Sequence, residues 1–76
     1  MEEGRVIYVV VLEERHIGWR VEAFRDLDEA NERARELARE YAWEESEIED
    51  LTEDGFVTMK FSEEGGYASV VGTEVR

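Results

Sequence analysis

The residues best suited to chemistry are concentrated in one acidic segment, "EESEIEDLTEDG", residues 44–55. It holds seven acids and no base, which is more than half of the chain's net charge of −12. The seven acids are Glu44, Glu45, Glu47, Glu49, Asp50, Glu53 and Asp54. Carboxylates at this density could bind a metal ion, take part in acid–base catalysis, form a disordered linker, imitate phosphates on a basic protein surface, or keep the protein solvated.

A calcium loop is the most specific of these possibilities. Residues 50–55 resemble the start of an EF-hand loop, with Asp50, Asp54 and Gly55 at its first, fifth and sixth positions. The twelfth position of such a loop must supply a bidentate glutamate, and here it is Phe61. Asp-Gly is also a strong hairpin signal. We therefore interpret the segment as a hairpin turn and expect neither a metal nor a cofactor.

The remaining residue types give no catalytic constellation. His16 is the only histidine and falls in a predicted loop, and no serine has an evident base beside it. No glycine-rich phosphate loop is present. A chain of 76 residues also leaves little room for a cleft that could desolvate a pair of carboxylates. We expect a protein that is not an enzyme and has no catalytic or cofactor-binding residues.

The charge also bears on partners and location. A net charge of −12 repels nucleic acid and anionic membranes, so the partner class that fits is a basic protein surface. No apolar run reaches the length of a membrane span, and the N-terminal "MEEG" argues against a signal peptide. There is no cysteine, so a reducing compartment is allowed. We expect a cytoplasmic protein.

The composition leaves two origins open. Lys60 is the only lysine, against eight arginines, as in proteins of salt-loving organisms. The acid is concentrated rather than spread, however, and glutamate outnumbers aspartate 17 to 4, which is less typical of them. A high-GC genome favours the same residues. The absence of proline and the regular helix are also compatible with a computed design.

The pattern of apolar residues predicts the elements that must position this segment. Alternating and β-branched runs indicate strands, and Asp26 is suited to cap a helix that ends near Trp43. The predicted strands are residues 5–14, 19–24, Glu47–Thr52, 56–62 and 67–75. The order β-β-α-β-β-β favours an α+β fold, a four- to five-stranded antiparallel sheet with one helix on one face, as a single domain over residues 1–76.

The helix has an apolar stripe and predicted charge pairs. Glu29 lies three residues after the capping Asp26 and four before Arg33, so it is expected to support the cap and to pair with that arginine. The stripe consists of Leu27, Ala30, Ala34, Leu37, Ala38 and Tyr41. Its three alanines would allow the helix to lie close to the sheet.

One helix can cover only one face of such a sheet, yet the first strand has apolar residues on both sides. A half-solvated antiparallel strand should alternate apolar and polar residues. The two sets are Val6, Tyr8, Val10 and Leu12 on one side, and Ile7, Val9 and Val11 on the other. We expect the uncovered face to be an association surface, most simply that of a homodimer, although a different partner could occupy it. Strong curvature of the sheet or the chain termini could also hide it.

The layout resembles that of a group of known small proteins. A strand, a short loop, the strand "RVEAF", an alanine-rich helix and a terminal hairpin with an "EDG" turn follow one another over roughly residues 6–72. This order is similar to that of several small proteins of phages and mobile elements, including some anti-CRISPR inhibitors. The resemblance implies a possible inhibitor and assigns no residue a function.

The sequence therefore favours a small acidic interaction module in which residues 44–55 dock on a basic protein surface. The alternative is a stable scaffold domain, natural or designed, in which the acid serves only solubility or salt adaptation.

Overall fold

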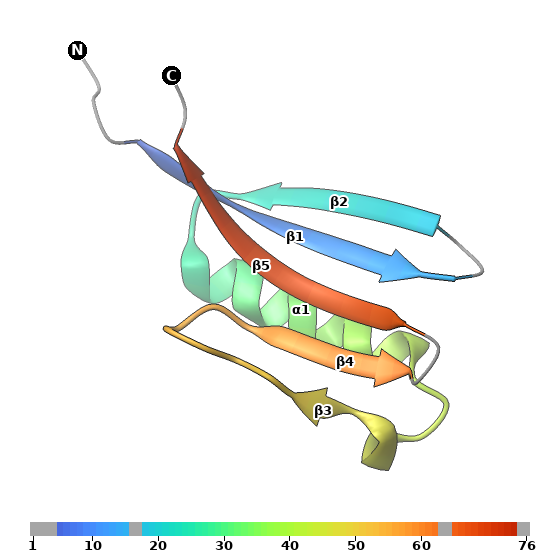
Figure 1. The fold of residues 1–76 in the computed structure, drawn as a ribbon. Helices are drawn as coiled ribbons and strands as arrows, with labels where there is room; N and C mark the ends of the chain where they lie inside the picture. The colour runs from blue at the N-terminus through green and yellow to red at the C-terminus, as the bar shows by residue number, and fades with distance from the viewer. Residues whose placement is uncertain (1–4, 16–17, 63–64, 75–76) are drawn as a thin grey trace.

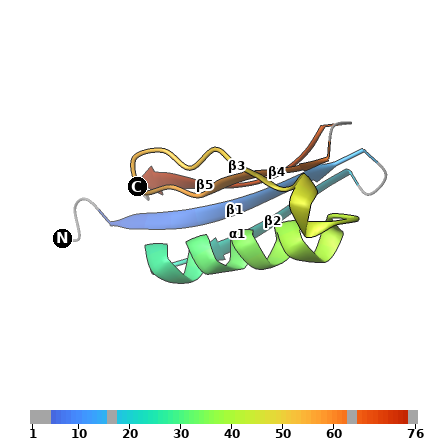
Figure 2. The ribbon, with the colours of Figure 1, turned by 90° about the horizontal axis from the view of Figure 1, so that it is seen from below.

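One helix packs across one face of a five-stranded antiparallel sheet, and no element of the described residues covers the other face (Figures 1 and 2). The structure is a computed structural model, which describes residues 5–15, 18–62 and 65–74. The elements follow in the order β-β-α-β-β-β. The predicted α+β fold is confirmed, with all five strands present.

The strands pair in the order β2-β1-β5-β4-β3, so β5 lies in the middle and β2 and β3 form the edges. The elements are β1 (Val6–Glu14), β2 (Gly18–Phe24), α1 (Leu27–Tyr41), the 3₁₀ helix η1 (Glu45–Glu47), β3 (Glu49–Asp50), β4 (Thr58–Ser62) and β5 (Gly66–Glu74). The first and last strands therefore lie side by side, with Val9 opposite Val71. The pairing of β1 with β5 therefore connects the N-terminal hairpin to the C-terminal strands in one sheet.

Helix α1 begins and packs largely as the sequence predicts. Asp26 is the N-cap, and its side chain accepts a hydrogen bond of 2.8 Å from the backbone N–H of Asp28. The buried stripe includes all three predicted alanines. The helix ends at Tyr41, two residues before the predicted end, because Ala42 is already extended.

The core lies between α1 and the sheet. Val10 and Leu12 of β1 are buried and face the helix, which places Ile7, Val9 and Val11 on the other side. The core is completed by Ala68 and Val70 of β5, by Met59 and Phe61 of β4, and by Val57 just before it. Glycine is needed at position 66, because a Cβ there would lie 2.6 Å from the ring of Phe61.

The prediction of a strand over Glu47–Thr52 is wrong in extent. The chain forms η1 first, and only Glu49 and Asp50 pair with β4 as a strand. Beyond Asp50, side-chain hydrogen bonds replace some of the backbone bonds of the ladder. Asp50 Oδ1 accepts the Thr52 N–H at 2.9 Å, and Thr52 Oγ1 accepts the Thr58 N–H at 3.4 Å.

The predicted hairpin turn is confirmed. Glu53 and Phe56 exchange both backbone hydrogen bonds, at 3.0 and 3.2 Å, around the Asp54–Gly55 pair. Both central residues have positive φ, 55° at Asp54 and 83° at Gly55, as a two-residue hairpin turn of type I′ requires. Because this turn and the side-chain bonds occupy residues 51–57, the ladder of β4 starts at Thr58 rather than at the predicted residue 56.

Among the described residues, no helix is both long and apolar enough to cross a bilayer.

Candidate interaction site

The acidic segment forms one long edge of the molecule. We call Glu44, Glu45, Glu47, Glu49, Asp50, Glu53 and Asp54 the acidic edge. These residues lie in the stretch before η1, in η1, on edge strand β3 and in the turn that leads toward β4 (Figure 1). All seven are exposed. The structure thus brings all the predicted partner-binding residues to one edge of the sheet, along and beside the edge strand β3.

No residue of the acidic edge forms an ion pair with another described residue. Ion pairs join residues elsewhere, such as Arg20, Glu22, Arg33 and Glu36. Hydrogen bonds within the edge are local, such as that from Ser46 Oγ to Glu44 at 3.5 Å. The carboxylates therefore present their charge to solvent.

Asp50 has the most constrained carboxylate of the edge. Hydrogen bonding from the Thr52 side chain, and then from the Thr52 backbone N–H, lowers the pKa of Asp50, and the nearby charge of Arg35 lowers it slightly further. Asp50 therefore remains ionised to more acidic pH than an ordinary aspartate. It supplies a fixed negative charge rather than a proton.

The geometry of residues 50–55 is that of a hairpin and not of a metal loop. One Asp50 oxygen is occupied by the Thr52 N–H, and Phe61, which stands where a calcium ligand would be needed, is buried in the core. Among the described residues, no three His, Cys, Asp or Glu side chains are grouped so that they could hold a metal ion.

A small hollow separates the acidic edge from the helix. Its volume is about 230 Å³, which is below the ~300–1,000 Å³ typical of ligand pockets. It is lined by Arg35, Ala38, Arg39, Glu45, Ile48, Asp50 and Met59. The lining includes no histidine, and its two carboxylates, those of Glu45 and Asp50, belong to exposed residues. His16 lies outside the described residues.

A fully exposed tryptophan stands at the start of the acidic edge. Trp43, which the sequence suggested as the end of the helix, is 93% exposed and directly precedes Glu44 and Glu45. A tryptophan face attracts lysine and arginine side chains, and tryptophan is enriched at the energetic centres of interfaces. Its position extends the candidate site beyond carboxylates, and the sequence analysis missed this residue as a candidate.

The buried Asn31 holds the tip of the acidic edge in place. Its Nδ2 donates to the Gly55 carbonyl at 2.8 Å, and its Oδ1 accepts the Val57 N–H at 3.1 Å. These bonds fasten the turn that carries Glu53 and Asp54 to the helix. The sequence analysis missed Asn31; the signal was an amide adjoining Ala30 on the apolar side of the helix.

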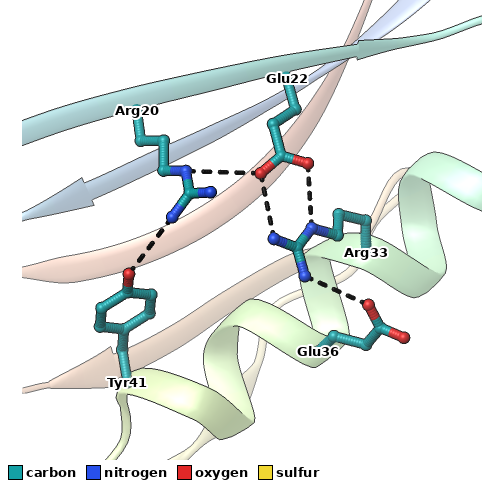
Figure 3. A network of polar contacts seen from close by, with 5 residues as sticks. All are labelled: Arg20, Glu22, Arg33, Glu36 and Tyr41. Carbon is teal, nitrogen blue, oxygen red and sulfur yellow. Dashed lines mark hydrogen bonds and ion pairs between the residues drawn. The ribbon is translucent and has the colours of Figure 1, made fainter.

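Strand β2 turns most of its apolar side chains away from the helix. The apolar set of β2, which includes Trp19 and Val21, faces away from the helix, and these two side chains are 69% and 61% exposed. The set with Arg20 and Glu22 faces the helix instead (Figure 3). The helix thus contacts the side of β2 that carries Arg20, Glu22 and the half-buried Phe24, while Trp19 and Val21 stay open.

A polar network fixes this orientation (Figure 3). Arg33 binds Glu22 through two bonds, Nε to Oε1 at 2.9 Å and Nη2 to Oε2 at 3.2 Å, and it also donates to Glu36 at 3.3 Å. Arg20 lies 3.5 Å from Glu22 and donates to the Tyr41 hydroxyl at 3.5 Å. The predicted pairing of Arg33 with Glu29 is wrong, because the bidentate geometry of Glu22 is the better match for a guanidinium.

The same network sets the charge state of Glu22. Hydrogen bonding from Arg33 lowers the pKa of Glu22; burial opposes this change, and the charges of Arg33 and Arg20 add to it. The carboxylate is therefore ionised at neutral pH and links β2 to α1.

Comparisons with known proteins find no family model, no curated protein and no solved structure that matches this chain. The resemblance to small phage and mobile-element proteins accordingly stays a prediction.

Proposed function

We propose that this chain is a cytoplasmic, non-enzymatic protein-interaction domain whose acidic edge docks on a basic protein surface. The observation that carries the proposal is the arrangement of the edge: seven exposed carboxylates along one side of the sheet, without an ion-pair partner among the described residues. A surface of this kind speeds association with a positively charged partner and selects against negatively charged ones.

The structure of the edge favours docking over simple solvation. Asn31 and the Asp54–Gly55 turn hold one end, and β3 pairs with β4 in the middle, so the carboxylates sit on ordered backbone. Less side-chain and loop entropy is lost when an ordered surface binds. Trp43 adds a large aromatic surface beside the charges, where a lysine or arginine of the partner can stack. A scaffold whose acid served only solubility would need neither feature.

An NMR titration with an arginine- and lysine-rich peptide tests this function. The expected result is a set of shifted amides confined to Trp43 and the acidic edge, and the shifts should disappear at high salt. Shifts distributed equally over the exposed acids of α1, such as Glu32 and Glu40, would show that the edge has no special function. The domain would then be the scaffold alternative.

A further inference from the structure

The sheet face opposite the helix is open in the described structure (Figure 2). We call this surface the open face. Its apolar residues lie over β2, β1 and β5, and they are Ile7, Val9, Val11, Val21, Ala23 and Val71. Val21 and Val71 are 61% and 51% exposed, which is unusual for valines on a regular sheet. Contiguous exposed apolar side chains of this kind mark association surfaces, because monomers seldom leave large apolar patches open.

The open face carries little of the chain's negative charge. Within the strands, its charged side chains are Glu13 of β1, Glu49 of β3 and Lys60 of β4. The acidic edge runs along one side of this face rather than across it. Two copies of a chain with a net charge of −12 can therefore approach through the open face without bringing most of their charge together.

The open face is large enough for a stable pair. β1 and β5 are nine residues long, β2 seven, β4 five and β3 two, so the face measures on the order of 500 Å² in strand geometry. Covering it on two protomers removes on the order of 1,000 Å², without counting the relief of the side chains, which reaches the ~1,000 Å² expected of a specific interface. Sheets that stack in this way are about 10 Å apart.

We propose that the open face binds a second copy of this chain, with the two-fold axis parallel to the strands. This axis reverses the strand order between the stacked sheets, so β1 of each protomer lies over β4 of the other and β5 lies over β5. The alternative axis, perpendicular to the strands, would stack one acidic edge on the other. With the parallel axis, the two acidic edges lie on opposite sides of the dimer, a sheet width of about 19 Å apart, well beyond a Debye length of ~8 Å.

The parallel axis also matches particular side chains across the interface. Glu13, Tyr67 and Lys60 form one row across β1, β5 and β4. Reversing the strand order places Glu13 of each protomer across from Lys60 of the other, which gives two pairs of opposite charges. In the next row, Val21 of β2 lies opposite Val11 of β1, and at the other end Leu51 lies beside Thr58, to whose carbonyl its N–H donates. The same rotation places Val21 of each protomer across from Leu51 of the other, and Leu51 is 43% exposed.

Sedimentation equilibrium from roughly 1 µM to 1 mM tests the dimer directly. We expect a reversible dimer for the wild type and a monomer for Val71→Lys, which buries an unpaired charge at the axis. Lys60→Glu and Glu13→Lys should each weaken association about tenfold or more, because each places like charges across the interface. The double variant Glu13→Lys/Lys60→Glu should restore it. Glu40→Lys on the exposed side of α1 is the matched control and should leave a dimer.

Three results would overturn the proposal. A wild type that is monomeric at every concentration would show that the open face does not bind a second copy. A dimer that persists in Val71→Lys, with unchanged circular dichroism, would place the contact elsewhere. A double variant that stays as weak as its two parents would exclude the arrangement about an axis parallel to the strands.

Discussion

Replacing Asn31 by alanine should lower the free energy of unfolding by about 2 kcal/mol. The change removes the donor to the Gly55 carbonyl and the acceptor of the Val57 N–H, two hydrogen bonds of 2.8 and 3.1 Å. Gly55 is exposed, so water can replace the first bond. Val57 is 0% exposed, so its N–H is left without a partner, at a cost of about 1–3 kcal/mol.

Two smaller contributions to the free energy of unfolding of Asn31→Ala nearly cancel. The lost bond to Gly55 costs about 0.5–1 kcal/mol, and the higher helix propensity of alanine returns a similar amount. For a domain of this size, each kcal/mol shifts the melting temperature by about 4–8 °C, so the expected decrease is roughly 8–16 °C.

Thermal and urea unfolding followed by circular dichroism would measure the change, with Glu32→Ala as the matched control. Glu32 is the next residue on the same helix and is exposed. Amide exchange at Val57 should accelerate in Asn31→Ala and stay unchanged in the control. If the two variants differ by less than about 0.5 kcal/mol, the amide does not fasten the hairpin and the reasoning is wrong.

Three further predictions concern the framework and the edge. Glu22→Gln should cost about 1 kcal/mol at neutral pH, since both partners are roughly a quarter exposed. Because the pKa of Glu22 is lowered in the folded state, the difference from wild type should be full above pH 4.5 and be lost as the pH falls through the lowered pKa, as urea titrations at several pH values would show. Gly66→Ala should destabilise by about 1–3 kcal/mol in the same assay, because the new Cβ meets Phe61, and an unchanged midpoint would contradict this contact. Trp43→Ala should leave stability within about 0.5 kcal/mol but raise the dissociation rate of a basic peptide in biolayer interferometry, and an unaltered rate would remove Trp43 from the site.

Local patterns were sufficient to predict most of the architecture. The Asp26 cap, the alanine stripe and the Asp-Gly turn each depend on residues close together in the chain, and all three are confirmed. The two apolar sets of β1 were also predicted, but not which set faces the helix. That choice depends on contacts between distant segments, such as the packing of Leu12 in the core.

The features that were missed share this long-range origin. Arg33 was paired with its helical neighbour Glu29, but its best partner, Glu22, lies eleven residues away on β2. Asn31 gains its function only when residues 24 and 26 positions later fold against it. The third strand was predicted too long because the side chains of Asp50 and Thr52 accept hydrogen bonds from backbone N–H groups that a longer ladder would use.

The central claim is that the position of the acid, rather than its total amount, produces binding. Stopped-flow association with a basic peptide, measured over a series of salt concentrations, tests it in two variants of equal charge. The edge variant carries Glu47→Gln, Glu49→Gln and Asp50→Asn, and the control carries the exposed helix changes Glu29→Gln, Glu32→Gln and Glu40→Gln.

Both variants remove three negative charges, so their effects on net charge are identical. We expect the edge variant to associate several-fold more slowly than wild type and with a flatter dependence on salt, while the control stays close to wild type. Equal association rates and equal salt dependence in the two variants would contradict the claim, because the acid would then act only through the net charge.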